Sequence, residues 1–341
     1  MRGLVWVVLC WSLGGVWSLA PTPQWDLSLF SPAKVNLFLR VLGKRDDGFH
    51  ELASLFQAID VGDVLRFGVL PSSAVRDEIE CDLPELPTDE SNLVTRAISL
   101  FRSRVPSAPF VRCFLEKALP MEAGLGGGSS NAATALWAMN ELSGRPATRN
   151  ELIDWSADLG SDVTFFLGDT GTAYCTGRGE IVEPLKPLSG ATELFVVKPR
   201  AVGLPTPLVF ETLGKTLNYA TLSPRDPRAD LLQAFTSDAG PGPDDFVNDL
   251  EPPAFQVEPK LRDLKAKLTK YFPAGAMMSG SGTALFAILD DAQRTDLDME
   301  QFPGTFRAEC REDLGLDVFV WRVAFANKPH KDSWFDHPSS R

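Results

Sequence analysis

The chain alternates apolar and polar residues soon after its apolar N-terminus. From residue 34 to residue 41, the odd-numbered positions carry Val, Leu, Leu and Val. Side chains of a strand point alternately to its two faces, so this period predicts a strand with Lys34, Asn36, Phe38 and Arg40 on one face. Residues 44–48, KRDDG, have the composition of a hairpin turn, and the apolar segment 52–70 follows. The folded part therefore begins with a predicted β-hairpin.

Helical spacing of apolar residues predicts helices over 91–104, 132–142, 148–160 and 259–272. Ser91 is the expected N-cap of the first of these, and Thr148 with Glu151 forms a capping box at the start of the third, which Gly160 would end. Strand-like segments occupy 110–119, 172–177, 194–199, 283–289 and 317–325. The Pro-rich segment 199–245 shows little periodicity.

The first twenty residues are typical of a cleavable secretory signal. Arg2 precedes an apolar run from Leu4 to Leu13, and the small residues Ser18 and Ala20 follow it. A membrane anchor is the alternative, although serine and glycine interrupt the run. We therefore treat residues 1–22 as a targeting segment outside the fold.

Charge and cysteine usage exclude several classes of function. A net charge of -12 and a pI of about 4.8 argue against general binding to nucleic acid or to anionic membranes, which requires a basic surface. The five cysteines contain no C-x-x-C pair and are far apart, and the three histidines do not cluster. The sequence therefore predicts neither a disulfide framework nor a zinc site, and it identifies no metal ligands.

Residues 120–131, PMEAGLGGGSSN, form a glycine-rich loop before the helix at 132–142. Glycines let backbone N–H groups converge on an anion, and a helix N-terminus adds partial positive charge, so we expect a phosphate here. A merely flexible turn is the alternative. No Lys follows the glycines as in a P-loop, and Ser129 occupies a position where the dinucleotide fingerprint needs Gly. The expected nucleotide-binding residues are Pro120, Met121, Glu122, Ala123, Gly124, Leu125, Gly126, Gly127, Gly128, Ser129 and Ser130.

Three motifs, read together, resemble the GHMP small-molecule kinases. They are SPAKVNLFLRVLGKRDDGFHEL (31–52), LPMEAGLGGGSSNAATAL (119–136) and MSGSGTALF (278–286). The first motif and LPTPLVF (204–210) are similar to the members that phosphorylate a cytidine-diphosphate-linked methylerythritol in the non-mevalonate isoprenoid pathway. The resemblance extends from about residue 30 to residue 325.

The resemblance implies an α+β, two-domain GHMP kinase fold. We expect a ribosomal protein S5 domain 2-like N-terminal domain at 23–188, a ferredoxin-like C-terminal domain at 189–327, and a polar tail at 328–341. The two domains would enclose the substrate in a cleft.

The resemblance also assigns roles to single residues. Asp162 matches the catalytic aspartate, which takes the proton of the attacking hydroxyl, and Lys34 matches the catalytic lysine that keeps it ionised. A helix cap and a solvated strand lysine are the respective alternatives.

Substrate contacts are implied for six further residues. Asn36 would bond the substrate, His50 would bond the cytosine edge, and Phe49 and Phe210 would stack on its two faces, with Thr206 and Pro207 beside Phe210. Ordinary core packing is the alternative for Phe210.

ATP and Mg²⁺ are the implied cofactors, with Ser130 as a candidate magnesium ligand. This chain departs from the usual pattern at Phe49, where Tyr is common, at Thr164, where Pro is frequent, and at Glu122. Because Lys34 and Asp162 are present, we expect changed affinity rather than lost chemistry.

Other interpretations remain open at this stage. Another kinase of the same superfamily, of the mevalonate or homoserine type, would share the glycine loops, and a metabolite sensor without turnover would share the fold. We expect a small-molecule substrate, no nucleic acid, no stable membrane association after processing, and a monomer or homodimer. An ATP-dependent enzyme behind a secretory-type signal suggests a plastid (chloroplast) location in an alga with a complex plastid.

Overall fold

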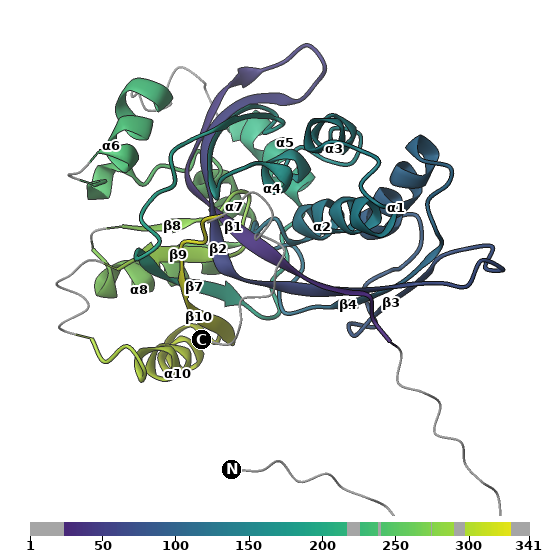
Figure 1. Ribbon diagram of the computed structural model, residues 1–341. Helices are drawn as coiled ribbons and strands as arrows, with labels where there is room; N and C mark the ends of the chain where they lie inside the picture. The colour runs from purple at the N-terminus through teal and green to yellow at the C-terminus, as the bar shows by residue number, and fades with distance from the viewer. Residues whose placement is uncertain (1–23, 217–225, 238–239, 274, 290–296, 329–341) are drawn as a thin grey trace, which may run out of the picture.

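The computed structural model describes residues 24–216, 226–237, 240–273, 275–289 and 297–328. The predicted targeting segment and nearly all of the predicted polar tail lie outside these residues. Two β-sheets with packed helices make up the described part, as Figure 1 shows, which confirms the α+β class. No helix in these ranges has the length and apolar character needed to cross a membrane.

The first sheet contains six strands in the order β3-β4-β2-β5-β6, with β1 paired to β2. The strands are β1 (Leu27–Lys44), β2 (His50–Val69), β3 (Glu78–Cys81), β4 (Val111–Glu116), β5 (Thr172–Gly177) and β6 (Ile181–Pro184). The expected hairpin is confirmed, because β1 and β2 pair along their whole length and Gly48 adopts a φ of 85° in the connecting turn.

The predicted alternation along β1 is correct only as far as residue 36. Asn36 pairs with Phe56 and Phe38 pairs with Leu55, so Leu37 is the extra residue of a β-bulge. The bulge reverses the facing of the later residues, and Phe38 packs into the same core as Val35. Leu39 consequently lies on the face that carries Lys34 and Asn36.

Four helices pack together with the first sheet. They are α1 (Leu93–Arg104), α2 (Gly127–Leu142), α3 (Arg149–Ser156) and α4 (Val163–Leu167). The N-cap of α1 is Asn92 rather than Ser91, because the Asn92 amide oxygen accepts from the Val94 N–H while the Ser91 hydroxyl donates to Asp89. The capping box of α3 is confirmed, but α3 ends at Ser156, before Gly160.

The second sheet has the order β10-β7-β9-β8 and is antiparallel throughout. Its strands are β7 (Glu193–Pro199), β8 (Ala276–Met278), β9 (Leu285–Ile288) and β10 (Val318–Ala324), and its main helices are α5 (Thr206–Thr216), α7 (Glu251–Val257), α8 (Pro259–Tyr271) and α10 (Phe302–Leu314). Between α5 and α7 the chain forms three short helical elements: a π-helical turn (Pro227–Leu232), α6 (Gln233–Thr236) and a 3-10 turn (Pro243–Asp245). The β-α-β-β-α-β order is the expected ferredoxin-like arrangement. Helix α5 occupies the Pro-rich segment in which the sequence indicated no periodic element.

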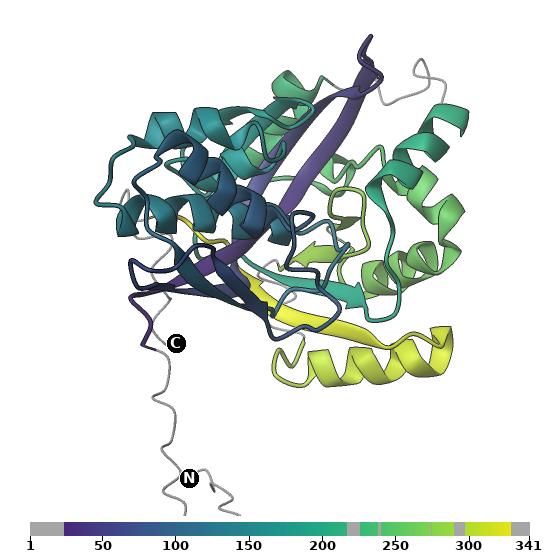
Figure 2. The same cartoon turned by 90° about the vertical axis from the view of Figure 1, so that its right-hand side faces the viewer.

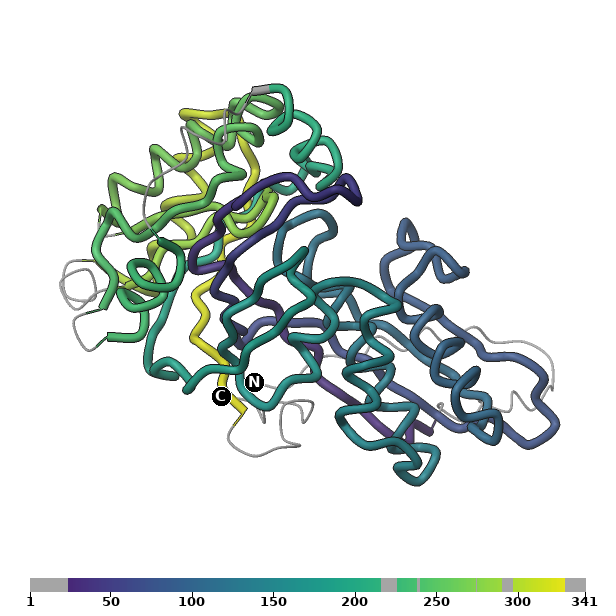
Figure 3. Tube along the Cα trace, turned by 90° about the horizontal axis from the view of Figure 1, so that it is seen from above, coloured from purple at the N-terminus to yellow at the C-terminus, as the bar shows by residue number. Residues whose placement is uncertain are grey.

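The β1–β2 hairpin runs between the two units of the structure. In Figure 2 the blue helices of the first unit lie on one side of it, and the yellow helix α10 with most of the green elements of the second unit lies on the other; Figure 3 shows the two groups from above. Leu39 and Val41 of β1 belong to the hydrophobic core of the second unit, whereas Val35 and Phe38 belong to the core between the sheets. Residues of this one hairpin therefore pack into both cores, so the hairpin connects the two units.

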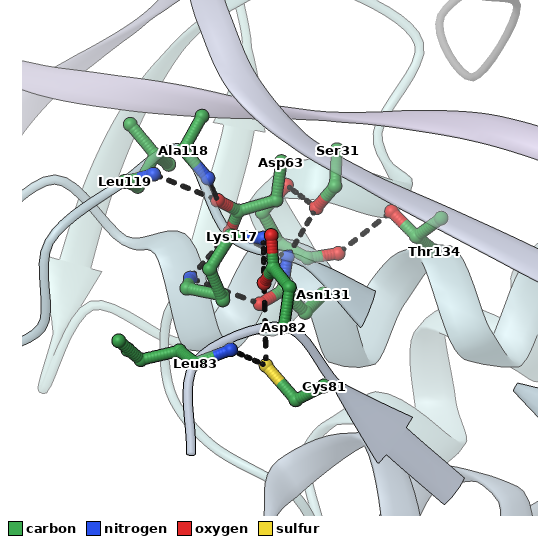
Figure 4. A network of polar contacts seen from close by, with 11 residues as sticks. Ser31, Asp63, Cys81, Asp82, Leu83, Lys117, Ala118, Leu119, Asn131 and Thr134 are labelled. Carbon is green, nitrogen blue, oxygen red and sulfur yellow. Dashed lines mark hydrogen bonds and ion pairs between the residues drawn. The ribbon is translucent and has the colours of Figure 1, made fainter. Parts of the chain in front are cut away.

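A buried carboxylate clasps the two ends of the glycine-rich loop (Figure 4). Asp63 of β2 is fully buried and accepts hydrogen bonds from the backbone N–H groups of Ala118 and Leu119, just before the loop. Its other oxygen accepts from the Asn131 amide, in the second turn of α2, and pairs with the Lys117 ammonium. Both stems of the loop are therefore tied to the same strand.

We expect Gly62→Ala to destabilise the protein by about 2 kcal/mol, because a Cβ at residue 62 would lie 2.2 Å from the Ser31 carbonyl oxygen. The matched control is Gly43→Ala in the same hairpin, where no atom lies within 4 Å of the added carbon. Its effect should stay within about 0.5 kcal/mol. Urea unfolding monitored by circular dichroism measures both, and equal midpoints would contradict the tight contact.

The clasp predicts strong coupling between Asp63 and Lys117. Asp63→Asn leaves a buried ammonium without its carboxylate and should cost about 3 kcal/mol of unfolding free energy. Adding Lys117→Met to that variant removes the orphaned charge, so we expect it to recover part of the loss. Additive effects in a double-mutant cycle by urea unfolding would show that the two side chains do not act as a pair.

Candidate active site

A cavity of about 500 Å³ lies where β1, β2, the glycine-rich loop and the start of α5 meet. Of the expected site residues, it is lined by Lys34, Asn36, Pro120, Met121, Glu122, Ala123, Gly124, Leu125, Gly126, Gly127, Gly128, Ser129, Asp162, Thr206 and Phe210. Four expected residues are not in its wall: Phe49, His50, Ser130 and Pro207.

Lys34 and Asp162 form an ion pair in this cavity. The Lys34 Nζ lies 3.5 Å from the Asp162 Oδ2, and it lies 4.5 Å from the centroid of the Phe56 ring. The Lys34 side chain is 4% exposed and that of Asp162 is 29% exposed. Asp162 precedes α4 but makes no capping hydrogen bond, so it does not act as a helix cap. Its carboxylate instead faces the cavity beside a buried ammonium.

Asn36 orients the Lys34 side chain. The Lys34 Nζ donates to the Asn36 Oδ1 at 2.6 Å, which confirms that the two side chains share a face. The Asn36 Nδ2 donates to the Ser54 Oγ at 2.8 Å, and its backbone N–H donates to the Ser279 Oγ. Both ends of the amide are thus engaged, and Asn36 is 1% exposed.

Two glycines of the loop allow close approaches that a side chain would block. Gly126 has a φ of 70°, and a Cβ on it would lie 3.0 Å from the Lys34 Cγ. Gly124 has a φ of 73°, and a Cβ there would lie 2.1 Å from the Ser279 carbonyl oxygen. The Lys34 N–H also donates to the Leu125 carbonyl at 2.9 Å. The loop therefore lies directly against β1 and the second glycine cluster.

Helix α2 begins at Gly127, inside the glycine-rich loop and before the predicted start at residue 132, and its first residues lie at the cavity. Gly126, Gly127, Gly128 and Ser129 line it, and no side chain caps the first N–H groups of the helix. Such unpaired N–H groups, together with the helix dipole, favour an anion. Ser130 is directed elsewhere, because it is fully buried and its hydroxyl accepts from the Ser31 hydroxyl at 2.8 Å.

The second glycine cluster, residues 278–282, closes against the first loop. The backbone N–H groups of Thr283 and Ala284 donate to the carbonyls of Glu122 and Ala123. The Ser279 hydroxyl donates to the Gly124 carbonyl at 2.9 Å. These bonds connect the two units across the cavity.

The unusual residues Glu122 and Thr164 have different surroundings. Glu122 has a φ of 50°, lines the cavity, and packs its side chain against Gly203. Burial lowers the pKa of the neighbouring Lys198 to about 8, an effect that the Glu122 carboxylate opposes. Thr164 does not reach the cavity wall, and its hydroxyl is hydrogen-bonded to that of Ser156.

Aromatic side chains contact Phe210 and Arg178 of the cavity wall, and we call this part the aromatic end of the cavity. The His50 ring stacks on the Phe210 ring, with centroids 5.0 Å apart and planes at 26°. Burial lowers the pKa of His50, and the Lys44 charge lowers it further. Phe49 is 54% exposed, and the guanidinium of Arg178 lies 4.9 Å from its ring centroid. Phe210 also packs against the second core, so the core-packing alternative holds for part of its surface.

Sequence reasoning missed Asp63, Lys117 and Arg178. Lys117 and Arg178 line the cavity, and Asp63 holds Lys117. A signal existed for Asp63, a charged residue inside an apolar strand segment. No periodicity marks Arg178, whose position depends on how β5 and β6 fold back onto the hairpin.

Two family models match this chain. The GHMP kinases N terminal domain matches residues 92–169, and the GHMP kinases C terminal model matches residues 231–305. A relative from Protochlamydia amoebophila (strain UWE25), a 4-diphosphocytidyl-2-C-methyl-D-erythritol kinase, is 44% identical over 285 residues, which is 84% of this chain and 89% of the relative. The chloroplastic enzyme of the same name from Oryza sativa subsp. japonica is 43% identical over 92% of this chain and 74% of its own length.

Solved structures agree with these sequence matches. A crystal structure of 4-(cytidine 5'-diphospho)-2C-methyl-D-erythritol kinase superposes on this chain with a TM-score of 0.68 at 30% sequence identity. The match covers 88% of this chain and 100% of the crystallised one. Homoserine kinase from Cytophaga hutchinsonii reaches a TM-score of 0.67 at 18% identity, covering 91% of this chain and 98% of its own, and shows the fold alone. The expected GHMP kinase fold is confirmed, and the chain belongs to the 4-diphosphocytidyl-2-C-methyl-D-erythritol kinase family of GHMP kinases.

Proposed function

We propose that this kinase transfers a phosphoryl group from ATP to the 2-hydroxyl of 4-diphosphocytidyl-2-C-methyl-D-erythritol, with Lys34 and Asp162 as the reacting pair. The observation that carries the proposal is their ion pair in the wall of the cavity that the glycine-rich loop also lines. Phosphoryl transfer needs a positioned nucleophile and neutralised phosphate charge, and this cavity supplies groups for both.

Asp162 accepts the proton of the attacking hydroxyl. Its carboxylate is accessible from the cavity, whereas Lys34 is buried beneath it and held by Asn36. The ammonium pairs with the carboxylate at 3.5 Å and faces the charge that develops on the transferred group. Asn36 acts through Lys34, since both ends of its amide are already engaged.

The nucleotide phosphates lie against residues 120–130, with the N-terminus of α2 directed at them. Bound together with ATP, Mg²⁺ would neutralise phosphate charge. The described residues contain no group of three or more His, Cys, Asp or Glu side chains that could hold a metal ion. That composition suits Mg²⁺, which binds mainly through substrate phosphates and water with one or two carboxylates. The cavity offers two, Glu122 and Asp162.

The cytosine of the substrate binds at the aromatic end of the cavity. His50 bonds the cytosine edge, and Phe49 and Phe210 stack on its two faces, with the His50 ring stacked on Phe210 in the structure without ligand. The Thr206 hydroxyl, hydrogen-bonded to that of Ser281, fixes the start of α5 beside Pro207. Mevalonate and homoserine, the alternative acceptors, carry no base that such rings could bind. The relatives at 43–44% identity bear the cytidylyl name, which favours this substrate over those alternatives.

We extend the proposal to domains, assembly and location. The chain has domains at 23–188 and 189–327, supported by the last strand of the first sheet ending at Pro184 and the next beginning at Glu193. It works as a monomer or homodimer. Several plant relatives are named chloroplastic, which supports a plastid location here. Entry through a secretory-type signal in residues 1–22, in an alga with a complex plastid, is the finer hypothesis.

We expect Asp162→Asn to lower kcat by about 10²- to 10⁴-fold, because the amide cannot accept the hydroxyl proton. A coupled assay of ADP release with the cytidylyl substrate measures this, and mevalonate and homoserine should give no turnover in either protein. Nucleotide affinity should change little.

The matched control is Asp158→Asn, which changes an exposed carboxylate after α3 that pairs with Arg104 outside the cavity. It should leave kcat unchanged. Binding of ATP and of the cytidylyl substrate by the wild type without ADP release would instead identify a metabolite sensor.

A further inference from the structure

Three basic side chains line the cavity in the described part of the chain: Lys34, Lys117 and Arg178. Lys34 pairs with Asp162, and Lys117 is held by the fully buried Asp63 and hydrogen-bonded to the Asn131 amide oxygen at 3.4 Å. Arg178 is different, because its side chain is 39% exposed and its ion pair with Glu180 is long, at 3.6 Å. Of the three, Arg178 has the charge most accessible to a ligand.

Arg178 stands between the two ends of the substrate region. Its guanidinium lies 4.9 Å from the Phe49 ring centroid, at the aromatic end. The next residue, Gly179, lies against the reacting end, since a Cβ built on it would be 3.4 Å from the Asp162 Oδ1. A ligand that reaches from the aromatic rings to Asp162 must therefore pass this turn.

The backbone of the turn is fixed while the side chain is accessible. The Gly179 N–H donates to the Thr176 carbonyl at 3.1 Å, and the Arg178 N–H donates to the Glu180 carboxylate. The Gly177 N–H donates to the Glu51 Oε1 at 3.1 Å, which ties the turn to β2. Gly177 and Gly179 have φ values of 71° and 108°, so the turn depends on glycine on both sides of Arg178.

We propose that Arg178 binds the diphosphate of the substrate and thereby selects alcohols that are linked to a nucleoside diphosphate. This rests on the proposed function, in which the base and the reacting hydroxyl occupy opposite ends of the cavity. The diphosphate joins those two parts and lies beside Arg178. A guanidinium presents paired N–H donors that match phosphate oxygens, and binding requires only that it leave the long contact with Glu180. In a chain of net charge -12, such a local cation is needed to hold a second polyanion beside ATP.

Arg178→Met tests this inference by isothermal titration of CDP and of cytidine to the whole protein without ATP. We expect the wild type to bind CDP more tightly than cytidine. The variant should lose about 10- to 100-fold in CDP affinity, the effect of a hydrogen bond to a charged group, and less than about threefold in cytidine affinity. Arg178→Lys, which keeps the charge without the planar fork, should give an intermediate loss.

Arg228→Met is the matched control. The Arg228 guanidinium also lies over a ring, 5.2 Å from the Tyr174 centroid, and pairs with a carboxylate, that of Glu183, but Arg228 does not line the cavity. It should bind CDP and cytidine as the wild type does.

Steady-state kinetics separate this inference from the proposed function. Arg178→Met should raise KM for the cytidylyl substrate while KM for ATP and kcat stay within about threefold of the wild type. Equal losses of CDP and cytidine affinity would overturn the inference, because Arg178 would then only support the Phe49 ring. A raised KM for ATP would also overturn it, because Arg178 would then bind ATP rather than the cytidylyl substrate. Absence of turnover in the wild type would instead contradict the proposed function, while the titrations would still decide whether Arg178 reads a diphosphate.

Discussion

The buried ammonium of Lys34 is the constraint on which the rest of this site depends. The residue is 3% exposed, and a charge so far from water is tolerated only when nearby groups compensate it. Asp162 provides the counter-charge and Asn36 the hydrogen bond, while the Phe56 ring lies against the ammonium. Asp162, Asn36 and Phe56 lie in three separate segments of the chain, so the fold of the first unit is what brings them to the Lys34 ammonium.

Glycine makes this arrangement possible by removing atoms at the points of closest approach. Gly126 admits the stem of Lys34, and Gly124 admits the Ser279 carbonyl. A loop with so much backbone freedom is costly to order, and the structure compensates at both of its stems through Asp63. The uncapped N–H groups at the start of α2 are consequently held in place at the cavity.

Basic side chains lie in the cavity wall of a protein whose net charge is negative. The chain is acidic, yet three basic side chains line its cavity. Lys117 is fixed by a buried carboxylate near the loop, and Lys34 is fixed beside Asp162. Arg178 has the most exposed side chain of these three, at 39%, and a long ion pair, and it stands between the Phe49 ring and the turn beside Asp162.

The sequence by itself determined the hairpin, the helix following the glycine loop, the capping box of α3 and the placement of Lys34 and Asn36 on one face, because these follow from local periodicity and turn chemistry. The sequence motifs also indicated the GHMP kinase family. Tertiary structure decided the rest. The bulge at Leu37 reversed the facing of Phe38 and Leu39, since pairing with β2 rather than local alternation sets the register. Ser130 turned from the cavity toward Ser31, and His50 stacked on Phe210. The positions of Asp63 and Arg178 likewise depend on contacts between segments far apart in the chain, which no local pattern of residues encodes.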